Sequence, residues 1–393
     1  MMGKIVGLNG DEAVAYAAKQ SSVDVLAAYP ITPQTIIVEK FNEFVADGDV
    51  HTEFVCVESE HSAMSASVGA SLTGARVFTA SASQGLALMH EILYLASSMR
   101  CPIVMGIANR ALSAPINIFA DHSDMMGSRD CGWIQIYTED AQEAYDWVIQ
   151  AFKIAENSDI LLPITVNLDG FTISHSTQDV NMLDDKDVKK FLPPKKIEYL
   201  LDPEKPMTVG AGNNPDYYYE LKMQQVEAMN KAPQVVKRVN DEFKNFSGRK
   251  YGIVDTYEMK DAEIGVMALG SVTGTAISIA EEMRMAGNKV GVIKPWLYRP
   301  FPSKEILASL KNLDVLAVID RAISFGAPFG PLCNDIMAIL QNEEIDLKVF
   351  NVITGLGGRD ITPNMTRSIF EEALEVQKEK KVKKPVIYLG VRS

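Results

Sequence analysis

Cysteine is scarce in this sequence of 393 residues, which contains only four. They stand at Cys56, Cys101, Cys131 and Cys333, without the short spacings of zinc or iron–sulfur ligands. The same wide separation excludes a dense disulfide framework. We therefore expect four buried thiols and no metal cluster held by cysteine.

Long apolar runs are missing as well. No uninterrupted apolar stretch approaches the ~20 residues that a membrane span requires, so we expect no membrane association. The segment from Met1 to Val6 lacks the long apolar stretch and cleavage site of a secretory signal. The expectation is a cytoplasmic protein.

Negative charge outweighs positive charge, and two cofactor signatures are absent. The net charge of −13 argues against nucleic-acid binding, which draws on clustered Lys and Arg. The dinucleotide fingerprint G-x-G-x-x-G is absent, which disfavours a nicotinamide dehydrogenase. The Gly-Asp-Gly start of a magnesium–diphosphate loop is absent too, because Asp47-Gly48-Asp49 has a different order. Groups that anchor a phosphate must therefore come largely from elsewhere.

What the sequence does contain is a regular alternation of strand-like and helix-like segments. It runs from about residue 10 to residue 170 and is typical of a doubly wound α/β layer, whose last strand we expect at 161–166. Residues 184–260 are rich in charge, proline and tyrosine, which predicts a long excursion with helical material and little sheet. A second α/β unit is expected to start near Ile264, with later strands at 289–293, 315–320 and 347–353.

Polar residues follow four of the expected strands in the first unit. The turns are Tyr29-Pro30-Ile31-Thr32-Pro33, Glu58-Ser59-Glu60, Ser81-Ala82-Ser83-Gln84-Gly85 and Asn109-Arg110. In an open parallel sheet, ligands bind outside the carboxyl ends of the strands. We therefore expect a convergence on one crevice of Thr32, Glu60, Ser83, Gln84 and Arg110.

Each of these features also has an ordinary structural explanation. A carboxylate at a helix start, such as Glu60, gains ~0.5 kcal/mol from the helix dipole alone. Arg110 suits a loop salt bridge as well as a substrate carboxylate. A functional role for Glu60 is favoured by the small residues that follow it, which leave a smooth helix surface for a flat ring or a partner: Ala63, Ala66, Gly69, Ala70 and Gly74.

Three further motifs stay open. Residues 121–124, Asp-His-Ser-Asp, suit acid–base groups or a hydrogen-bonded loop, and the lack of metal-ligand spacing favours the loop. The glycines of 270–274 favour a packing turn over an anion site. The segment 356–360, Leu-Gly-Gly-Arg-Asp, is equally ambiguous.

Together, several motifs in the same order resemble the alpha subunit of pyruvate:ferredoxin oxidoreductase, in the 2-oxoacid:ferredoxin oxidoreductase family. In the first unit they are Tyr-Pro-Ile-Thr-Pro at 29–33, Glu-Ser-Glu-His at 58–61, Ala-Ser-Gln-Gly at 82–85 and Ala-Asn-Arg-Ala-Leu-Ser-Ala-Pro at 108–115. In the second they are Lys-Pro-Trp-Leu-Tyr-Arg-Pro-Phe-Pro at 294–302 and Gly-Leu-Gly-Gly-Arg-Asp at 355–360. The resemblance spans the chain.

The resemblance implies an α/β fold with a doubly wound, pyrimidine-type thiamine diphosphate domain over residues 1–250, including a helical connector at about 184–250. A smaller transketolase C-terminal-like domain is implied over 251–393. Thiamine diphosphate is then shared with a beta subunit, and Mg²⁺ and 4Fe–4S clusters are held by partner subunits. A gamma subunit and a ferredoxin-like delta subunit complete the implied hetero-oligomer.

The implied reaction is oxidative decarboxylation of pyruvate to acetyl-CoA and CO₂ with reduction of ferredoxin, or the reverse synthesis. By the same resemblance, Glu60 activates the cofactor through its pyrimidine ring, and Thr32 and Arg110 hold the substrate carboxylate. Further cofactor contacts are implied for Pro30, Ile31, Ser83 and Gln84.

Two alternatives are kept. One is the same chemistry on another 2-oxoacid, such as 2-oxoisovalerate or 2-oxoglutarate; a second arginine in the turn would suit a dianionic substrate better than Thr32 does. The other is a non-catalytic scaffold subunit, which the presence of Glu60 and Arg110 disfavours.

Overall fold

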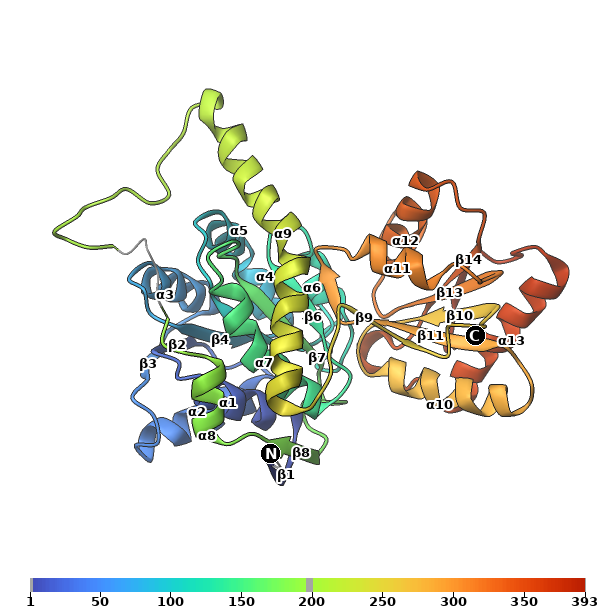
Figure 1. Ribbon diagram of the computed structural model, residues 1–393, viewed down its shortest axis with the longest axis horizontal. Helices are drawn as coiled ribbons and strands as arrows, with labels where there is room; N and C mark the ends of the chain where they lie inside the picture. The colour runs from blue at the N-terminus through green and yellow to red at the C-terminus, as the bar shows by residue number, and fades with distance from the viewer. Residues whose placement is uncertain (1–2, 196–200, 393) are drawn as a thin grey trace.

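The computed structural model describes residues 3–195 and 201–392, and every statement below concerns this part of the chain. Two α/β units lie side by side, with a long helix running along the first (Figure 1). A short antiparallel pair, β1 (Lys4–Leu8) with β8 (Gln178–Met182), lies close to the N-terminus. Within the described ranges, no helix combines the length and the apolar character that a bilayer crossing requires.

The first unit is built on a seven-stranded sheet in the order β12-β6-β7-β5-β4-β2-β3. All neighbours pair in parallel except β12, which is antiparallel to β6. The central strands are buried along their whole length, which explains why they appear in the sequence as apolar runs. The strands are β2 (Val25–Ala28), β3 (Glu53–Cys56), β4 (Val77–Ser81), β5 (Val104–Asn109), β6 (Ile134–Tyr137), β7 (Ile164–Asp169) and β12 (Leu297–Arg299).

Helices cover both faces of this sheet, and each face has its own apolar cluster. One cluster is formed with α1 (Gly10–Gln20), α2 (Thr35–Ala46) and α7 (Ala141–Ala155). The other is formed with α3 (Glu60–Leu72), α4 (Ser83–Leu88) and α5 (His90–Ser98). A short α6 (Ser123–Gly127) follows β5. The doubly wound layer expected from the sequence is therefore confirmed.

Three local expectations were wrong. The strand expected at 161–166 is β7, which lies inside the sheet between β5 and β6 instead of ending it. The edge position is taken by β12, which comes from the second half of the sequence. The turn at 81–85 suggests a single helix after it that ends at about Met99, but the structure has two helices, α4 and α5, divided at Met89. Cys56 is exposed, whereas the other three thiols are buried.

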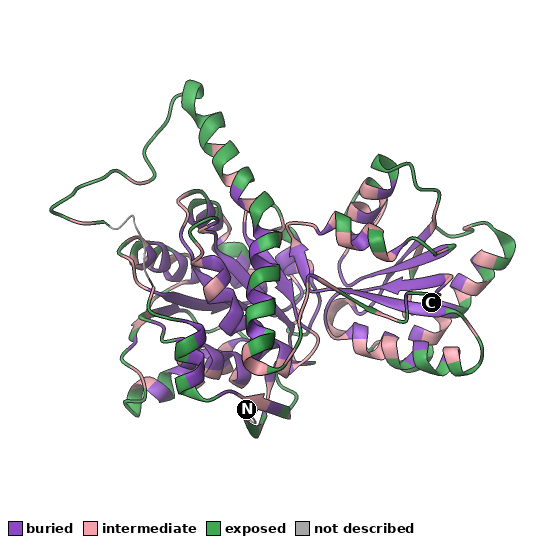
Figure 2. Cartoon of the chain, viewed as in Figure 1, coloured by how far each residue is buried: buried purple, intermediate pink, exposed green. Residues whose placement is uncertain are grey.

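The excursion after the first unit is mostly helical, as expected. It contains α8 (Asp185–Phe191) and α9 (Pro215–Ser247), a helix of 33 residues. The start of α9 projects from the molecule and is exposed, whereas its later turns pack on the first unit through residues such as Val236 and Phe243 (Figure 2). Beyond the helix, Arg249 pairs with the buried carboxylate of Asp146, which fixes the end of the connector.

The second unit contains a six-stranded sheet in the order β15-β14-β13-β10-β11-β9, with only β9 antiparallel to its neighbour. One face packs against α10 and α13 and the other against α11 and α12. The strands are β9 (Val254–Tyr257), β10 (Ile264–Met267), β11 (Val290–Pro295), β13 (Val315–Asp320), β14 (Lys348–Ile353) and β15 (Val386–Tyr388). The helices are α10 (Val272–Met285), α11 (Ser303–Ser309), α12 (Pro331–Asn342), α13 (Pro363–Glu379) and the 3₁₀ turn η1 (Leu356–Gly358).

Candidate active site

The strand order of the first sheet reverses next to β2. The chain passes from β2 to β3 on one side and then returns to β4 on the other. The turns after β2 and β4 therefore border a topological switch point, which is where open α/β sheets bind ligands. Thr32 follows β2, and Ser83 and Gln84 follow β4, so three of the expected site residues flank this position.

The carboxylate of Asp124 ties these turns together. Its Oδ2 accepts the N–H of Ser83 at 3.0 Å and the N–H of Arg110 at 2.9 Å, so one oxygen joins the segments after β4 and β5. Its Oδ1 accepts from Asn109 Nδ2 at 2.9 Å and from the N–H of Met125 at 2.7 Å. Burial raises the pKa of Asp124 to about 6, although these hydrogen bonds oppose the shift. Asp124 thus organises the site from within the hydrogen-bonded loop favoured by the sequence.

Arg110 lies against the turn that contains Thr32. Its Nη1 donates to the carbonyl oxygen of Thr32 at 2.9 Å, and its Nε donates to the carbonyl oxygen of Asn117 at 2.8 Å. These contacts use two of the five guanidinium N–H groups. Nη2 and the second N–H of Nη1 are not used by either contact. Burial lowers the pKa of Arg110, but its ordinary value is so high that the side chain stays charged.

Glu60 is the first residue of α3 and is buried, with 7% of its surface exposed. A Cβ atom added to Gly85 would lie 2.5 Å from Oε1 of Glu60 and 2.7 Å from Oγ of Ser81. Gly85 therefore provides the space for this carboxylate. Among the described residues, Ser81 Oγ and Gln84 Nε2 are buried without a hydrogen-bond partner. Since buried polar atoms are normally paired, these groups fit a polar ligand beside Glu60, such as an aminopyrimidine ring.

The remaining cofactor-binding candidates lie in the turn before α2. Pro30 is exposed and Ile31 is partly buried. The N–H of Ile31 donates to Gln34 Oε1 at 3.1 Å, and Gln34 Nε2 donates to the carbonyl oxygen of Ala80 at 2.9 Å. Gln34 thus fastens this turn to β4. The contacts bring Thr32, Ser83 and Arg110 together and set Glu60 against Gly85, at the ends of β2, β3, β4 and β5.

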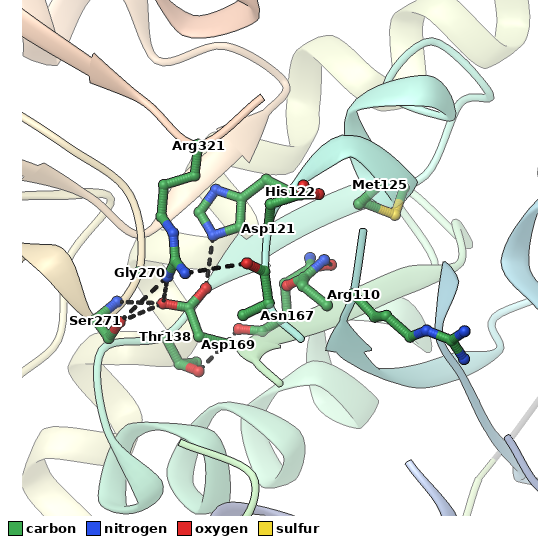
Figure 3. Close-up of polar contacts among 12 residues, drawn as sticks. Arg110, Asp121, His122, Met125, Thr138, Asn167, Asp169, Gly270, Ser271 and Arg321 are labelled. Atoms are coloured by element: carbon green, nitrogen blue, oxygen red, sulfur yellow. Dashed lines mark hydrogen bonds and ion pairs between the residues drawn. The ribbon is translucent and has the colours of Figure 1, made fainter. Parts of the chain in front are cut away.

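A second buried carboxylate locks the two units together, and its role was missed in the sequence (Figure 3). Asp169, the last residue of β7, contacts His122 Nε2 through Oδ1 at 2.7 Å and Arg321 Nη1 through Oδ2 at 2.6 Å. The N–H of Ser271 donates to the same Oδ2 at 2.9 Å. Burial alone would raise the pKa of Asp169, but Arg321 and His122 hold it well below its usual range. The available signal was only that Asp169 and Arg321 stand at strand ends.

The turn at Gly270 completes this lock. With φ at +73°, Gly270 brings its backbone so close to Asp169 that a Cβ atom would lie 3.0 Å from Oδ2. The turn therefore does receive an anion, but the anion is a side chain of the same molecule. The packing turn favoured by the sequence is what the structure shows.

Two family models match the chain. The model described as "Pyruvate flavodoxin/ferredoxin oxidoreductase, thiamine diP-bdg" matches residues 16–241. The model described as "Pyruvate:ferredoxin oxidoreductase core domain II" matches residues 262–366. The two matches fall on the first and second α/β units respectively.

Curated relatives match over nearly the full length. Pyruvate synthase subunit PorA of Thermotoga maritima is 50% identical over 370 residues, which are 94% of each chain. The protein of the same name from Methanocaldococcus jannaschii is 50% identical over 363 residues, 92% of each chain. Ketoisovalerate oxidoreductase subunit VorA of Pyrococcus horikoshii is 42% identical over 381 residues, 96% of each chain.

A solved structure shares the fold. It is the 2-oxoglutarate:ferredoxin oxidoreductase from Magnetococcus marinus, with 2-oxoglutarate, coenzyme A and succinyl-CoA bound, which matches with a TM-score of 0.75 at 19% identity. The match covers 95% of the present chain but 66% of the Magnetococcus chain, slightly less than two thirds.

Replacing Asp169 with Asn should loosen the two units, because it leaves Arg321 buried without its counter-charge. We expect a loss of about 3–5 kcal/mol at pH 7, measured by chemical denaturation. The folded pKa of Asp169 lies below the unfolded value of about 3.9. Its contribution is therefore present above about pH 4 and is lost as pH falls towards the folded value, so the deficit of the variant should shrink in acid.

Asp261→Asn is the matched control for this prediction, because Asp261 pairs with Arg284 on the surface and is 55% exposed. It should change the free energy of unfolding far less than Asp169→Asn does, because surface ion pairs contribute little. Equal effects of the two changes at pH 7 would show that the buried pair does not hold the units together.

Proposed function

Because the chain belongs to the pyruvate:ferredoxin oxidoreductase family, we propose that it works as the alpha subunit of a thiamine diphosphate enzyme that oxidises pyruvate to acetyl-CoA and CO₂ with reduction of ferredoxin, or runs the reverse synthesis. The observation that carries this proposal is Glu60, whose carboxylate lies against Gly85 beside Ser81 Oγ, a buried atom with no hydrogen-bond partner among the described residues. Arg110, at the end of the neighbouring strand β5, supplies a fixed positive charge for the substrate.

We take the domain boundary near residue 250, with a pyrimidine-type domain at 1–250 and a transketolase C-terminal-like domain at 251–393. The gap between the matched ranges 16–241 and 262–366 supports this division. The short strand β12 crosses it, because residues after 295 pair with β6 of the first sheet.

Pyruvate is the preferred substrate in this proposal. The support is the 50% identity to pyruvate synthase subunits, against 42% to a ketoisovalerate oxidoreductase subunit. The guanidinium of Arg110, which lies against the turn of Thr32, also suits a monoanion. A branched 2-oxoacid such as 2-oxoisovalerate is the alternative, and comparing kcat/KM for the two acids decides between them.

Partner chains supply the rest of the site in this proposal. A beta subunit holds the diphosphate and Mg²⁺ and a 4Fe–4S cluster, and gamma and ferredoxin-like delta subunits complete the complex. Among the described residues, no group of three His, Cys, Asp or Glu side chains is arranged to hold a metal ion. The outer face of α3 also suits a close partner, since Ser65 and Gly69 are exposed and Ala66 and Ala70 are partly so.

The residues of this chain then have distinct tasks. Bound thiamine diphosphate supplies a nucleophilic carbon for attack on the 2-oxoacid. Glu60 is placed to share a proton with the ring nitrogen of the aminopyrimidine, with Ser81 and Gln84 completing its contacts. Arg110 and Thr32 orient the substrate carboxylate, and Asp124 keeps the backbone of Ser83 and Arg110 in register.

The isolated chain should bind thiamine diphosphate poorly, because the diphosphate and Mg²⁺ ligands are assigned to a partner. Calorimetry with Mg²⁺ present should show weak or no binding by this chain and tight binding after reconstitution with the partner subunits. Tight, magnesium-dependent binding by the chain alone would contradict the proposal that the cofactor site is divided between this chain and a partner.

Glu60→Gln keeps the shape of the side chain but removes its negative charge. Turnover of the assembled complex should fall by roughly 100-fold or more, the scale for loss of a positioned acid–base group, while assembly is retained. Deuterium exchange at the thiazolium carbon of the bound cofactor directly measures the loss of the proton from that carbon. An exchange rate near that of the wild type would contradict the assignment.

The effects of Arg110→Lys and Thr32→Val on kcat/KM for pyruvate should differ in size. The lysine retains charge but loses the fork that contacts Thr32, Asn117 and a carboxylate, so kcat/KM for pyruvate should fall strongly. Thr32→Val retains the carbonyl that accepts from Arg110 and removes one hydroxyl, so it should cost only ~1 kcal/mol. Steady-state kinetics at saturating ferredoxin and coenzyme A provide the measurement.

Arg238→Lys is the matched control, because Arg238 is 51% exposed on α9. It should leave kcat/KM unchanged. If Arg110→Lys behaved like this control, the carboxylate would have to be held by other residues.

A further inference from the structure

We propose that Asn117 is a positioning residue through which the second unit sets the orientation of Arg110. The inference rests on the proposed role of Arg110 in holding the substrate carboxylate. It assigns the glycine-rich turn at Gly355 to Gly358, left ambiguous by the sequence, to the substrate site as a support.

Asn117 connects three parts of the molecule. Its carbonyl oxygen accepts the N–H at Nε of Arg110 at 2.8 Å. Its side-chain Nδ2 donates to the carbonyl oxygen of Gly357, in the second unit, at 3.0 Å. Its Oδ1 accepts the N–H of Phe119 at 2.7 Å, which shapes its own loop. A continuous chain of hydrogen bonds therefore runs from Gly357 to the guanidinium.

The part of the loop that precedes Asn117 has little packing of its own, whereas Phe119 after it lies against Phe171, with ring centroids 5.0 Å apart. Residues 113–116 are exposed, and Ile116 is 82% exposed. An exposed segment of this kind is not held by core contacts, so its position depends on the few hydrogen bonds that it makes. The bond from Asn117 to Gly357 is thus well placed to decide where the partner of Arg110 Nε lies.

The glycines allow this close approach. A Cβ atom at Gly357 would lie 2.6 Å from Asn117 Nδ2, and one at Gly358 would lie 2.2 Å from Cβ of Phe119. Both have positive φ, at +58° and +75°. The N–H of Gly357 also donates to Asp121 Oδ2 at 3.1 Å, and the N–H of Gly358 donates to the carbonyl oxygen of Ala120 at 2.6 Å. The turn is therefore bound to the loop at Asn117 and again at residues 119–121.

The kinetic consequence is specific. If the second unit fixes one edge of the Arg110 guanidinium, the other N–H groups of that guanidinium keep one orientation. They then bind the carboxylate equally well in the bound substrate and in the transition state. Loss of this support removes uniform binding, which raises KM for pyruvate and leaves kcat nearly unchanged. Binding of coenzyme A and thiamine diphosphate should not change.

Two variants of the assembled complex test the proposal. Asn117→Asp keeps the acceptor for the N–H of Phe119 but replaces the donor to Gly357 with a repelling oxygen. Gly357→Ala pushes the same side chain away from the other side. Each should raise KM for pyruvate on the order of 10-fold, the scale of one hydrogen bond that involves a charged partner. The double variant should lose little more than the more affected single variant, because both changes break one contact.

Two controls separate a local effect from general damage. Gly326→Ala places a side chain at a glycine with φ at +83° and no neighbour within 4 Å. Ile116→Ala trims the most exposed apolar side chain of the same loop. Both should leave KM for pyruvate unchanged.

The outcomes are distinguishable. An unchanged KM in Asn117→Asp, with strong impairment in Arg110→Lys, overturns the coupling and leaves the proposed function intact. A parallel fall in kcat, cofactor binding and assembly overturns it as well, because the residue is then merely structural. Normal KM and kcat in the Arg110→Lys complex would instead contradict the proposed role of Arg110 in holding the substrate carboxylate.

Discussion

The hydrogen bonds gathered by the carboxylate of Asp124 are the constraint on which the candidate active site depends. A parallel sheet brings the carboxyl ends of its strands to one edge, but it does not fix the turns that follow them. Asp124 does so by binding the N–H groups of Ser83 and Arg110 with the same oxygen. A buried carboxylate is costly unless it is fully hydrogen-bonded, and here donors on both oxygens meet that requirement. Together with the hydrogen bond from Ser83 Oγ to the carbonyl oxygen of Ala111 at 2.6 Å, Asp124 therefore sets the distance between the turns after β4 and β5.

The second unit is part of this construction and not an appendage. The edge strand β12 completes the first sheet, and Asp169 forms an ion pair with Arg321 across the boundary. A buried pair of this kind adds little net stability but is expensive to break from one side. It therefore defines the relative position of the units more than it strengthens either, and the glycine turn at Gly357 can reach the loop after Arg110 only while that position is kept.

The sequence contained the parts of the site that depend on local pattern. Apolar runs with polar residues at their ends placed Thr32, Glu60, Ser83 and Arg110 at strand termini, and general knowledge of parallel sheets brought them together. The order of the strands could not be predicted from the sequence, because no periodic pattern in β6, β7 and β12 distinguishes an edge strand from a central one. The roles of Asp124 and Asp169 were hidden for the same reason, since a buried carboxylate is recognised by donors that are distant in sequence.

The polar atoms left unpaired near Glu60 lower the stability of the free subunit, and we attribute their presence to function. A buried polar group without a partner costs about 1–3 kcal/mol, and both Ser81 Oγ and Gln84 Nε2 are in this state within the described residues. Apolar side chains of similar size would remove that cost, so a chain selected for stability alone would not keep both. A ligand that pairs with these atoms would recover the energy on binding, which turns an unfavourable feature of the free subunit into affinity. The same reasoning applies to Gly85, since a larger residue there would fill the space that the Glu60 carboxylate occupies.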